Sequence, residues 1–77
     1  MEYYIARLPL AGEKCRTARH LKRLVNKRLQ EVLRYIALRE GRELRYPFTV
    51  LAGLYAEGKL VKTVALRIEI STRFTLL

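Results

Sequence analysis

Hydrophobic residues follow two different periods along the chain, and the changes between these periods divide it into predicted elements. Over residues 2–8 the side chains alternate, with Tyr3 and Ile5 on one face and Tyr4 on the other. A period of two in aromatic and β-branched residues is typical of a strand, and Pro9 ends the pattern because it cannot donate a ladder hydrogen bond. The sequence therefore predicts a strand over residues 2–8.

The pattern becomes helical from about Glu13 to Glu40. Apolar residues recur there at steps of three and four, which places them on one narrow stripe of a helix. The stripe consists of Ala18, Leu21, Val25, Leu29, Val32 and Ile36. Gly41 follows as a left-handed C-cap would, and the N-cap is Gly12 or, for a later start, Thr17. We predict one long amphipathic helix.

A period of two returns after Pro47 and continues through residues 48–56 and 60–70. Between these segments, Glu57-Gly58 is a tight-turn signal typical of a β-hairpin. The predicted fold class is α+β, with a small, mainly antiparallel sheet packed on the one long helix. The elements follow in the order strand–helix–strand–strand, with a fourth short strand over residues 73–77 as an alternative. We expect a single compact α+β domain over residues 1–77.

The predicted helix is long for the sheet it should cover. A helix of roughly 27 residues measures about 40 Å, whereas strands of six to ten residues span roughly 20–33 Å. The helix must therefore overhang the sheet, unless it breaks or another element packs on the overhang.

The outer face of the predicted sheet is not cleanly polar, and the chain ends on apolar residues. Both features favour a buried interface, in a homo-oligomer or on a larger assembly, although scattered surface apolar residues are common. The predicted interface residues are Leu51, Tyr55, Val61, Ala65, Phe74, Leu76 and Leu77.

Composition and charge narrow the class of partner. The 77 residues contain 16 Lys+Arg and 7 Asp+Glu, a net charge of +9, with 51% hydrophobic residues. The chain is too short for the large enzyme folds and too apolar for a disordered basic tail. Eleven of the 16 cations are arginines, whose planar guanidinium suits phosphate, so phosphate-bearing partners are favoured. The chain has no Asp and little Asn, Gln or Met, and this composition resembles that of a thermophile protein.

The cations of the predicted helix concentrate opposite its apolar stripe. Arg16, Arg23, Lys27 and Arg34 fall within about 40° of one another on a helical projection and extend over roughly 27 Å. The predicted nucleic-acid-binding residues are Lys14, Arg16, Arg19, Arg23, Lys27, Arg34, Arg39, Arg42 and Arg45. Like charges at these spacings repel one another, so a face that follows a phosphate backbone is favoured over a merely solvated face.

These features predict a non-catalytic nucleic-acid-binding protein. RNA is slightly favoured over DNA, by analogy with small basic α+β proteins of ribosomes and other ribonucleoprotein particles. The alternative is an interaction or assembly protein, such as a viral structural or regulatory subunit, whose basic helix face binds an acidic protein partner.

Aromatic residues on the predicted strands offer a second, weaker indication. Tyr4 and Tyr55 are the candidates for stacking on unpaired bases, although core packing is the more common role of such residues.

The chain offers few groups for catalysis, so we expect no enzymatic activity, cofactor or metal site. The lone Cys15 and the lone His20 lie five residues apart, about 140° around a helix, and do not share a metal. Cys15 beside Lys14 and Arg16 could have a lowered pKa, with an ordinary small side chain as the alternative. One cysteine, no visible signal peptide and no long apolar run predict a cytoplasmic protein without a membrane span.

Overall fold

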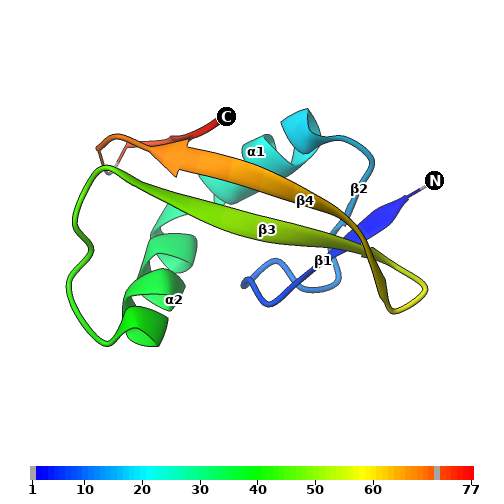
Figure 1. Ribbon diagram of the computed structural model, residues 1–77, viewed down its shortest axis with the longest axis horizontal. Helices are drawn as coiled ribbons and strands as arrows, with labels where there is room; N and C mark the ends of the chain where they lie inside the picture. The colour runs from blue at the N-terminus through cyan, green and yellow to red at the C-terminus, as the bar shows by residue number, and fades with distance from the viewer. Residues whose placement is uncertain (1, 71) are drawn as a thin grey trace.

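The computed structural model describes residues 2–70 and 72–77 and contains five antiparallel strands and two helices (Figure 1). The elements are β1 (Tyr3–Ala6), β2 (Lys14–Cys15), α1 (Ala18–Lys27), α2 (Leu29–Glu40), β3 (Phe48–Ala56), β4 (Lys59–Ile68) and β5 (Phe74–Leu76). The strands form one sheet in the order β2-β1-β3-β4-β5, and this sheet curls into a half-barrel. The prediction of a small sheet packed on one long helix is therefore wrong.

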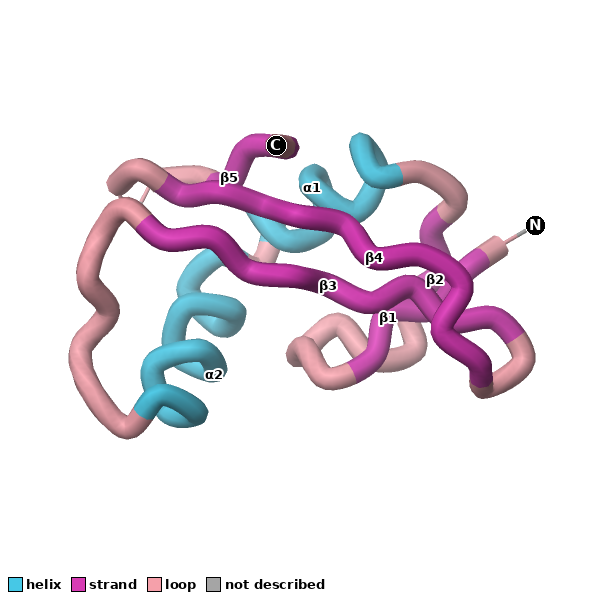
Figure 2. The backbone as a smooth tube through the Cα atoms, viewed as in Figure 1, coloured by secondary structure: helices cyan, strands magenta, loops and turns pink. Residues whose placement is uncertain are grey.

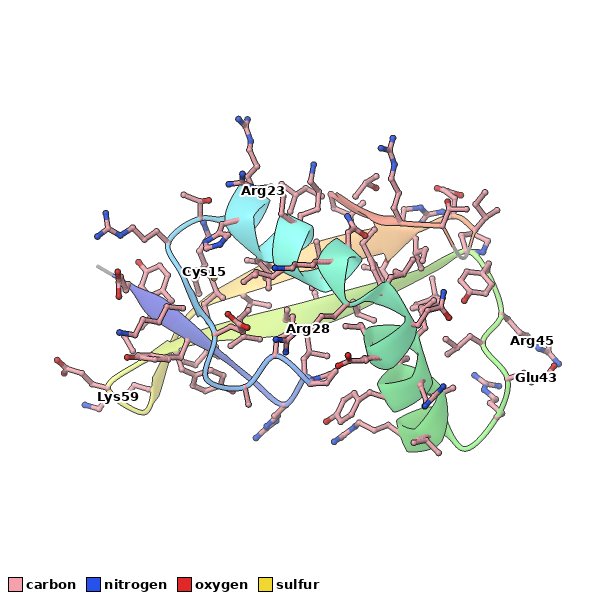
Figure 3. The ribbon with its side chains drawn as sticks, turned by 180° about the vertical axis from the view of Figure 1, so that it is seen from behind. Cys15, Arg23, Arg28, Glu43, Arg45 and Lys59 are labelled. Atoms are coloured by element: carbon pink, nitrogen blue, oxygen red, sulfur yellow. The ribbon has the colours of Figure 1, made fainter. Side chains whose placement is uncertain are left out.

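The predicted helix is two helices, which meet at Arg28. Its backbone leaves the helical region, with φ −115° and ψ 39°, and α2 turns away from the axis of α1 (Figure 3). The Arg28 guanidinium donates to the Pro9 carbonyl at 3.3 Å and to Glu13 Oε1 at 3.0 Å. A continuous helix of about 40 Å would exceed the longest dimension of the molecule, 35 Å. The break therefore resolves the predicted overhang.

The helical region also begins later than about Glu13. Lys14 and Cys15 form β2 and pair with Tyr4 and Tyr3 of β1. Thr17 then caps α1, since its Oγ1 accepts the His20 backbone N–H at 3.0 Å. The later of the two predicted starts is thus confirmed, and an edge strand occupies the residues before it.

Two turn predictions are confirmed by the backbone. Gly41 ends α2 in the left-handed conformation with φ 69°, and its N–H donates to the Ala37 carbonyl at 2.9 Å. Glu57 and Gly58 join β3 to β4 with φ 53° and 76°. Positive φ at both central residues is the geometry of a two-residue hairpin turn.

Helix α1 lies in the curve of the sheet and contacts both edge strands, β2 and β5 (Figure 2). The Asn26 side chain joins it to β5, because Oδ1 accepts the Phe74 N–H at 2.7 Å and Nδ2 donates to the Phe74 carbonyl at 3.0 Å. These two bonds reproduce those that a further strand would make. The helix therefore closes the edge of the sheet at β5.

The core fills the space between the two helices and the concave face of the sheet. Its fully buried members are Ile5, Leu10, Cys15, Leu21, Val25, Val32, Leu54, Leu66, Ile68 and Phe74. The structure contains no buried polar or charged residue among those it describes. Phe74 is 0% exposed, which corrects its prediction as an interface residue.

The first half of β4 extends beyond this core. Residues 59–63 are all exposed, and burial begins at Val64. Strand β5 pairs only with residues 66–68 of β4, and Leu77 N–H donates to the Ala65 carbonyl. In the part of the chain that the structure describes, residues 59–64 of β4 therefore have no strand on the side opposite β3.

We expect the substitution Asn26→Ala to destabilise the protein, because it leaves the Phe74 N–H and carbonyl without their partner. The loss should be about 1–3 kcal/mol in the free energy of unfolding, measured by chemical denaturation. In a domain of this size, each kcal/mol lowers the melting temperature by roughly 4–8 °C. Gln30→Ala, at an exposed position of α2, is the control. Equal stability of the two variants would contradict this role of Asn26.

Candidate nucleic-acid interface

Most of the net charge of the protein belongs to one short segment. Residues 14–28, which comprise β2, α1 and the helix break, contain seven cations and no carboxylate, a net charge of +7 out of +9. Residues 29–47, which comprise α2 and the following loop, contain four arginines and three glutamates. The two helices therefore differ sharply in charge.

Three cations form a row along the exposed side of α1. Arg19, Arg23 and Lys27 are exposed, while Leu21 and Val25 on the opposite side are fully buried. Successive members of the row lie four residues apart, about 6 Å along the axis, so the row measures about 12 Å. Phosphates of one strand in duplex DNA are about 3.4 Å apart along the axis, so the row is about as long as three to four of these spacings.

A cleft of about 290 Å³ lies between β2 and the first turn of α1. Its lining comprises Glu2, Lys14, Cys15, Arg16, Thr17, His20 and Arg23. Arg23 thus belongs both to the row and to the cleft (Figure 3). We call the row together with the cations of the cleft the α1 basic surface: Lys14, Arg16, Arg19, Arg23 and Lys27.

The row of the α1 basic surface is free of ion pairs within residues 2–70 and 72–77. The ion pairs of that region join Glu2 to Lys14 at 3.8 Å and to Arg16 at 3.6 Å, Glu13 to Arg28, and Glu69 to Arg67. Both Glu2 contacts are long and exposed, and such pairs contribute little to stability. The cations of this surface are therefore available to an external anion.

The remaining predicted cations lie apart from this surface. Arg34 and Arg39 belong to α2, whose axis diverges from that of α1, and Arg42 and Arg45 belong to the loop before β3. Figure 3 shows Arg23 on α1 and Arg45 well apart from it, in the loop at one end of the molecule. The prediction of one continuous stripe from Arg16 to Arg34 is wrong, because it assumed an unbroken helix.

Arg39 already has a partner within α2. Its Nη1 donates to the Tyr35 hydroxyl at 3.3 Å, and its guanidinium carbon lies 5.8 Å from the Tyr35 ring centroid. Glu31, Glu40 and Glu43 belong to the same region of the chain. We therefore exclude α2 and its loop from the candidate interface.

Cys15 lies at the floor of the cleft, with 1% of its surface exposed. Burial raises the pKa of its thiol above the usual value. Desolvation disfavours the thiolate, so the hypothesis of an activated cysteine is corrected and Cys15 is a small core residue.

The two predicted stacking residues are neighbours on the outer face of the sheet. Tyr4 of β1 pairs directly with Tyr55 of β3. Tyr4 is 41% exposed, and the Lys14 ammonium lies 5.8 Å from its ring centroid. The structure thus brings together two tyrosines that are distant in sequence and places a cation of the α1 basic surface beside them.

The predicted interface residues differ in how far the structure exposes them to solvent. Leu51 is 73% exposed on β3, and Leu77 is equally exposed after β5. Tyr55 and Ala65 are half-buried, while Val61 and Leu76 are exposed. Self-association through these residues stays a prediction.

A register shift in the hairpin places Leu60 beside Tyr55 on the outer face of the sheet. The pairing steps from Leu54 and Lys62 to Tyr55 and Leu60, so Val61 has no partner. Leu60 therefore lies beside Tyr55 on the outer face and is 57% exposed. The alternation of hydrophobic residues in the sequence of β4 does not predict this bulge.

We expect the Cys15 thiol to react slowly with a maleimide in the folded protein and rapidly in urea, because burial protects it and raises its pKa.

A raised pKa of the Cys15 thiol means that its protonated form stabilises the fold below the unfolded pKa of about 8.5. This stabilisation is lost as the pH rises through that value toward the folded pKa. The free energy of unfolding should therefore fall more between about pH 7 and about pH 9.5 in the wild type than in Cys15→Ala. An equal fall in the free energy of unfolding for the wild type and Cys15→Ala would contradict a raised pKa of the Cys15 thiol.

Comparisons with known proteins leave this surface to be interpreted from its own chemistry. No protein-family model matches the chain, and the comparisons with curated proteins and with solved structures give no significant match. No helix of the described residues is long and apolar enough to cross a membrane.

Proposed function

We propose that the protein binds nucleic acid without catalysing a reaction, and that the α1 basic surface contacts the phosphates. The observation that carries this proposal is the concentration of seven cations, and no carboxylate, in residues 14–28. Displacement of condensed counterions by such a surface gives affinity for phosphate backbones of any sequence. RNA is slightly favoured over DNA, and the proposed location is the cytoplasm.

The geometry of the surface supports a backbone contact rather than a pocket for a small anion. The row on α1 is linear, exposed and about 12 Å long, so its cations can meet successive phosphates. Arginine dominates the surface, and its guanidinium donates two parallel hydrogen bonds to one phosphate. An acidic protein partner offers carboxylates at irregular positions, and it is the alternative outcome of the test below.

We expect the double reversal Arg23→Glu and Lys27→Glu to abolish binding to oligonucleotides of about 20 residues, because it reverses two adjacent charges of the row. Affinity is measured by fluorescence anisotropy over a range of salt concentrations, with single- and double-stranded RNA and DNA. A plot of log K against log salt has a negative slope. Each phosphate contact that is lost makes this slope shallower by about 0.7–0.9.

The matched control is the double reversal Arg42→Glu and Arg45→Glu, which makes the same charge change in the loop after α2. It should reduce affinity only slightly, and the circular dichroism spectra of both variants should equal that of the wild type. A wild-type protein with no affinity tighter than ~100 μM for any of the four ligands at about 50 mM salt would refute the proposal. Binding of an acidic polypeptide but of no nucleic acid would instead identify the alternative.

Glu2 provides a second, independent test, since it is the one carboxylate in the lining of the cleft. We expect Glu2→Gln to strengthen oligonucleotide binding a few-fold at low salt, because it removes a negative charge that competes with phosphate for Lys14 and Arg16. The gain should vanish at high salt, where exposed charges are screened. Glu40→Gln on α2 makes the same charge change outside the surface and should leave affinity within twofold. An equal gain from both variants would show only an effect of net charge.

A further inference from the structure

Four residues lie side by side across the outer face of the sheet, one from each of four neighbouring strands. Lys14 of β2 pairs with Tyr4 of β1, Tyr4 pairs with Tyr55 of β3, and Tyr55 pairs with Leu60 of β4. Directly opposed residues of antiparallel strands point to the same face, with Cβ atoms about 4.5–5.5 Å apart. We call these four residues the tyrosine row.

The Tyr55 ring lies against the sheet surface over Gly53, which has no side chain to displace it. A Cβ atom at Gly53 would lie 2.9 Å from Cε2 of Tyr55 and 3.1 Å from Cδ1 of Leu60. The ring therefore occupies the space above Gly53 and lies beside Leu60. A ring that already packs on the sheet and beside Leu60 has less conformational freedom to lose when a flat ligand packs against it than a fully exposed ring.

The Tyr4 ring connects this aromatic surface to the cations. Lys14 Nζ lies 5.8 Å from the Tyr4 ring centroid, and Lys14 also lines the cleft that contains Arg16 and Arg23. Lys14 thus links the two surfaces, because it lines the cleft beside α1 and also lies beside the Tyr4 ring.

We infer that the nucleic acid bound by this protein is single-stranded, with bases that stack on Tyr4 and Tyr55 while its phosphates contact Lys14 and the α1 basic surface. This inference rests on the proposed function and names its ligand class. A duplex keeps its bases stacked inside the helix and cannot offer them to an external ring. Unpaired bases stack on aromatic side chains whatever their sequence.

A second copy of the chain is the competing occupant of the same face, since Leu60 and Leu51 are exposed there. Charge complementarity favours the nucleic acid, because two copies of a chain with a net charge of +9 repel each other, whereas a phosphate backbone attracts it. The oligomeric state is therefore measured together with binding.

The test compares Tyr4→Leu and Tyr55→Leu with the wild type, using oligo-dT of about 20 residues and a duplex of equal length. Each substitution should weaken binding of the single strand roughly 5- to 50-fold and leave duplex binding within twofold. Tyr4→Phe and Tyr55→Phe keep the ring and should retain single-strand affinity. Tyr35→Leu is the matched control, because Tyr35 on α2 has a cation at the same 5.8 Å distance but lies outside the tyrosine row.

Tyrosine fluorescence gives a readout that does not depend on affinity. The chain has five tyrosines and no tryptophan, so base stacking on Tyr4 and Tyr55 should quench part of its emission without interference from tryptophan. Quenching by saturating oligo-dT should decrease in Tyr4→Leu and in Tyr55→Leu but not in Tyr35→Leu. Thermal denaturation confirms that the variants are folded.

Several outcomes would overturn the inference. Equal losses of single-strand and duplex affinity in the tyrosine variants, or no loss in either, would exclude stacking. Tighter binding of duplex than of oligo-dT by the wild type would exclude a single-stranded ligand while leaving the proposed function intact. A dimer in analytical ultracentrifugation that Tyr55→Leu dissociates would assign the row to a second copy. If Arg23→Glu and Lys27→Glu also leave every affinity unchanged, the proposed function itself fails.

Discussion

The fold depends on the position of α1 inside the curve of the sheet, in contact with both edge strands. A curled sheet of five strands has two open edges and a concave apolar face, and each needs a partner. Helix α1 packs on this face through Leu21 and Val25, contacts β2, and bonds the backbone of β5 through the Asn26 side chain. One helix of ten residues thus supplies part of the core and covers the β5 edge of the sheet.

The same position determines where the charge of the protein lies. With its apolar side in the sheet, α1 must direct Arg19, Arg23 and Lys27 to the solvent. The break at Arg28 then separates this row from the mixed charges of α2. The basic surface is therefore restricted to one helix and one edge strand by a break at a residue whose side chain contacts Pro9 and Glu13.

Local signals in the sequence predicted the turns well but not the arrangement of the elements. Gly41 and Glu57-Gly58 act through their own backbone conformations, so their roles are readable from sequence. The break at Arg28 has no glycine or proline and depends on contacts with a distant turn. The partnership of Tyr4 with Tyr55 was likewise unreadable, because it depends on the register of strands about 50 residues apart in sequence. Candidate residues could be named from composition, but their grouping required the fold.

The open edge of β4 has a consequence for the aggregation of the protein. An unpaired strand edge is a template for pairing with the same edge of another molecule, which leads toward fibrous aggregates. Residues 59–64 form such an edge, yet Lys59 and Lys62 lie along it and the register shift at Val61 interrupts its regularity. Cationic side chains and bulges are the devices by which natural sheets discourage this pairing. The hairpin can thus project beyond the core without recruiting further copies edge to edge.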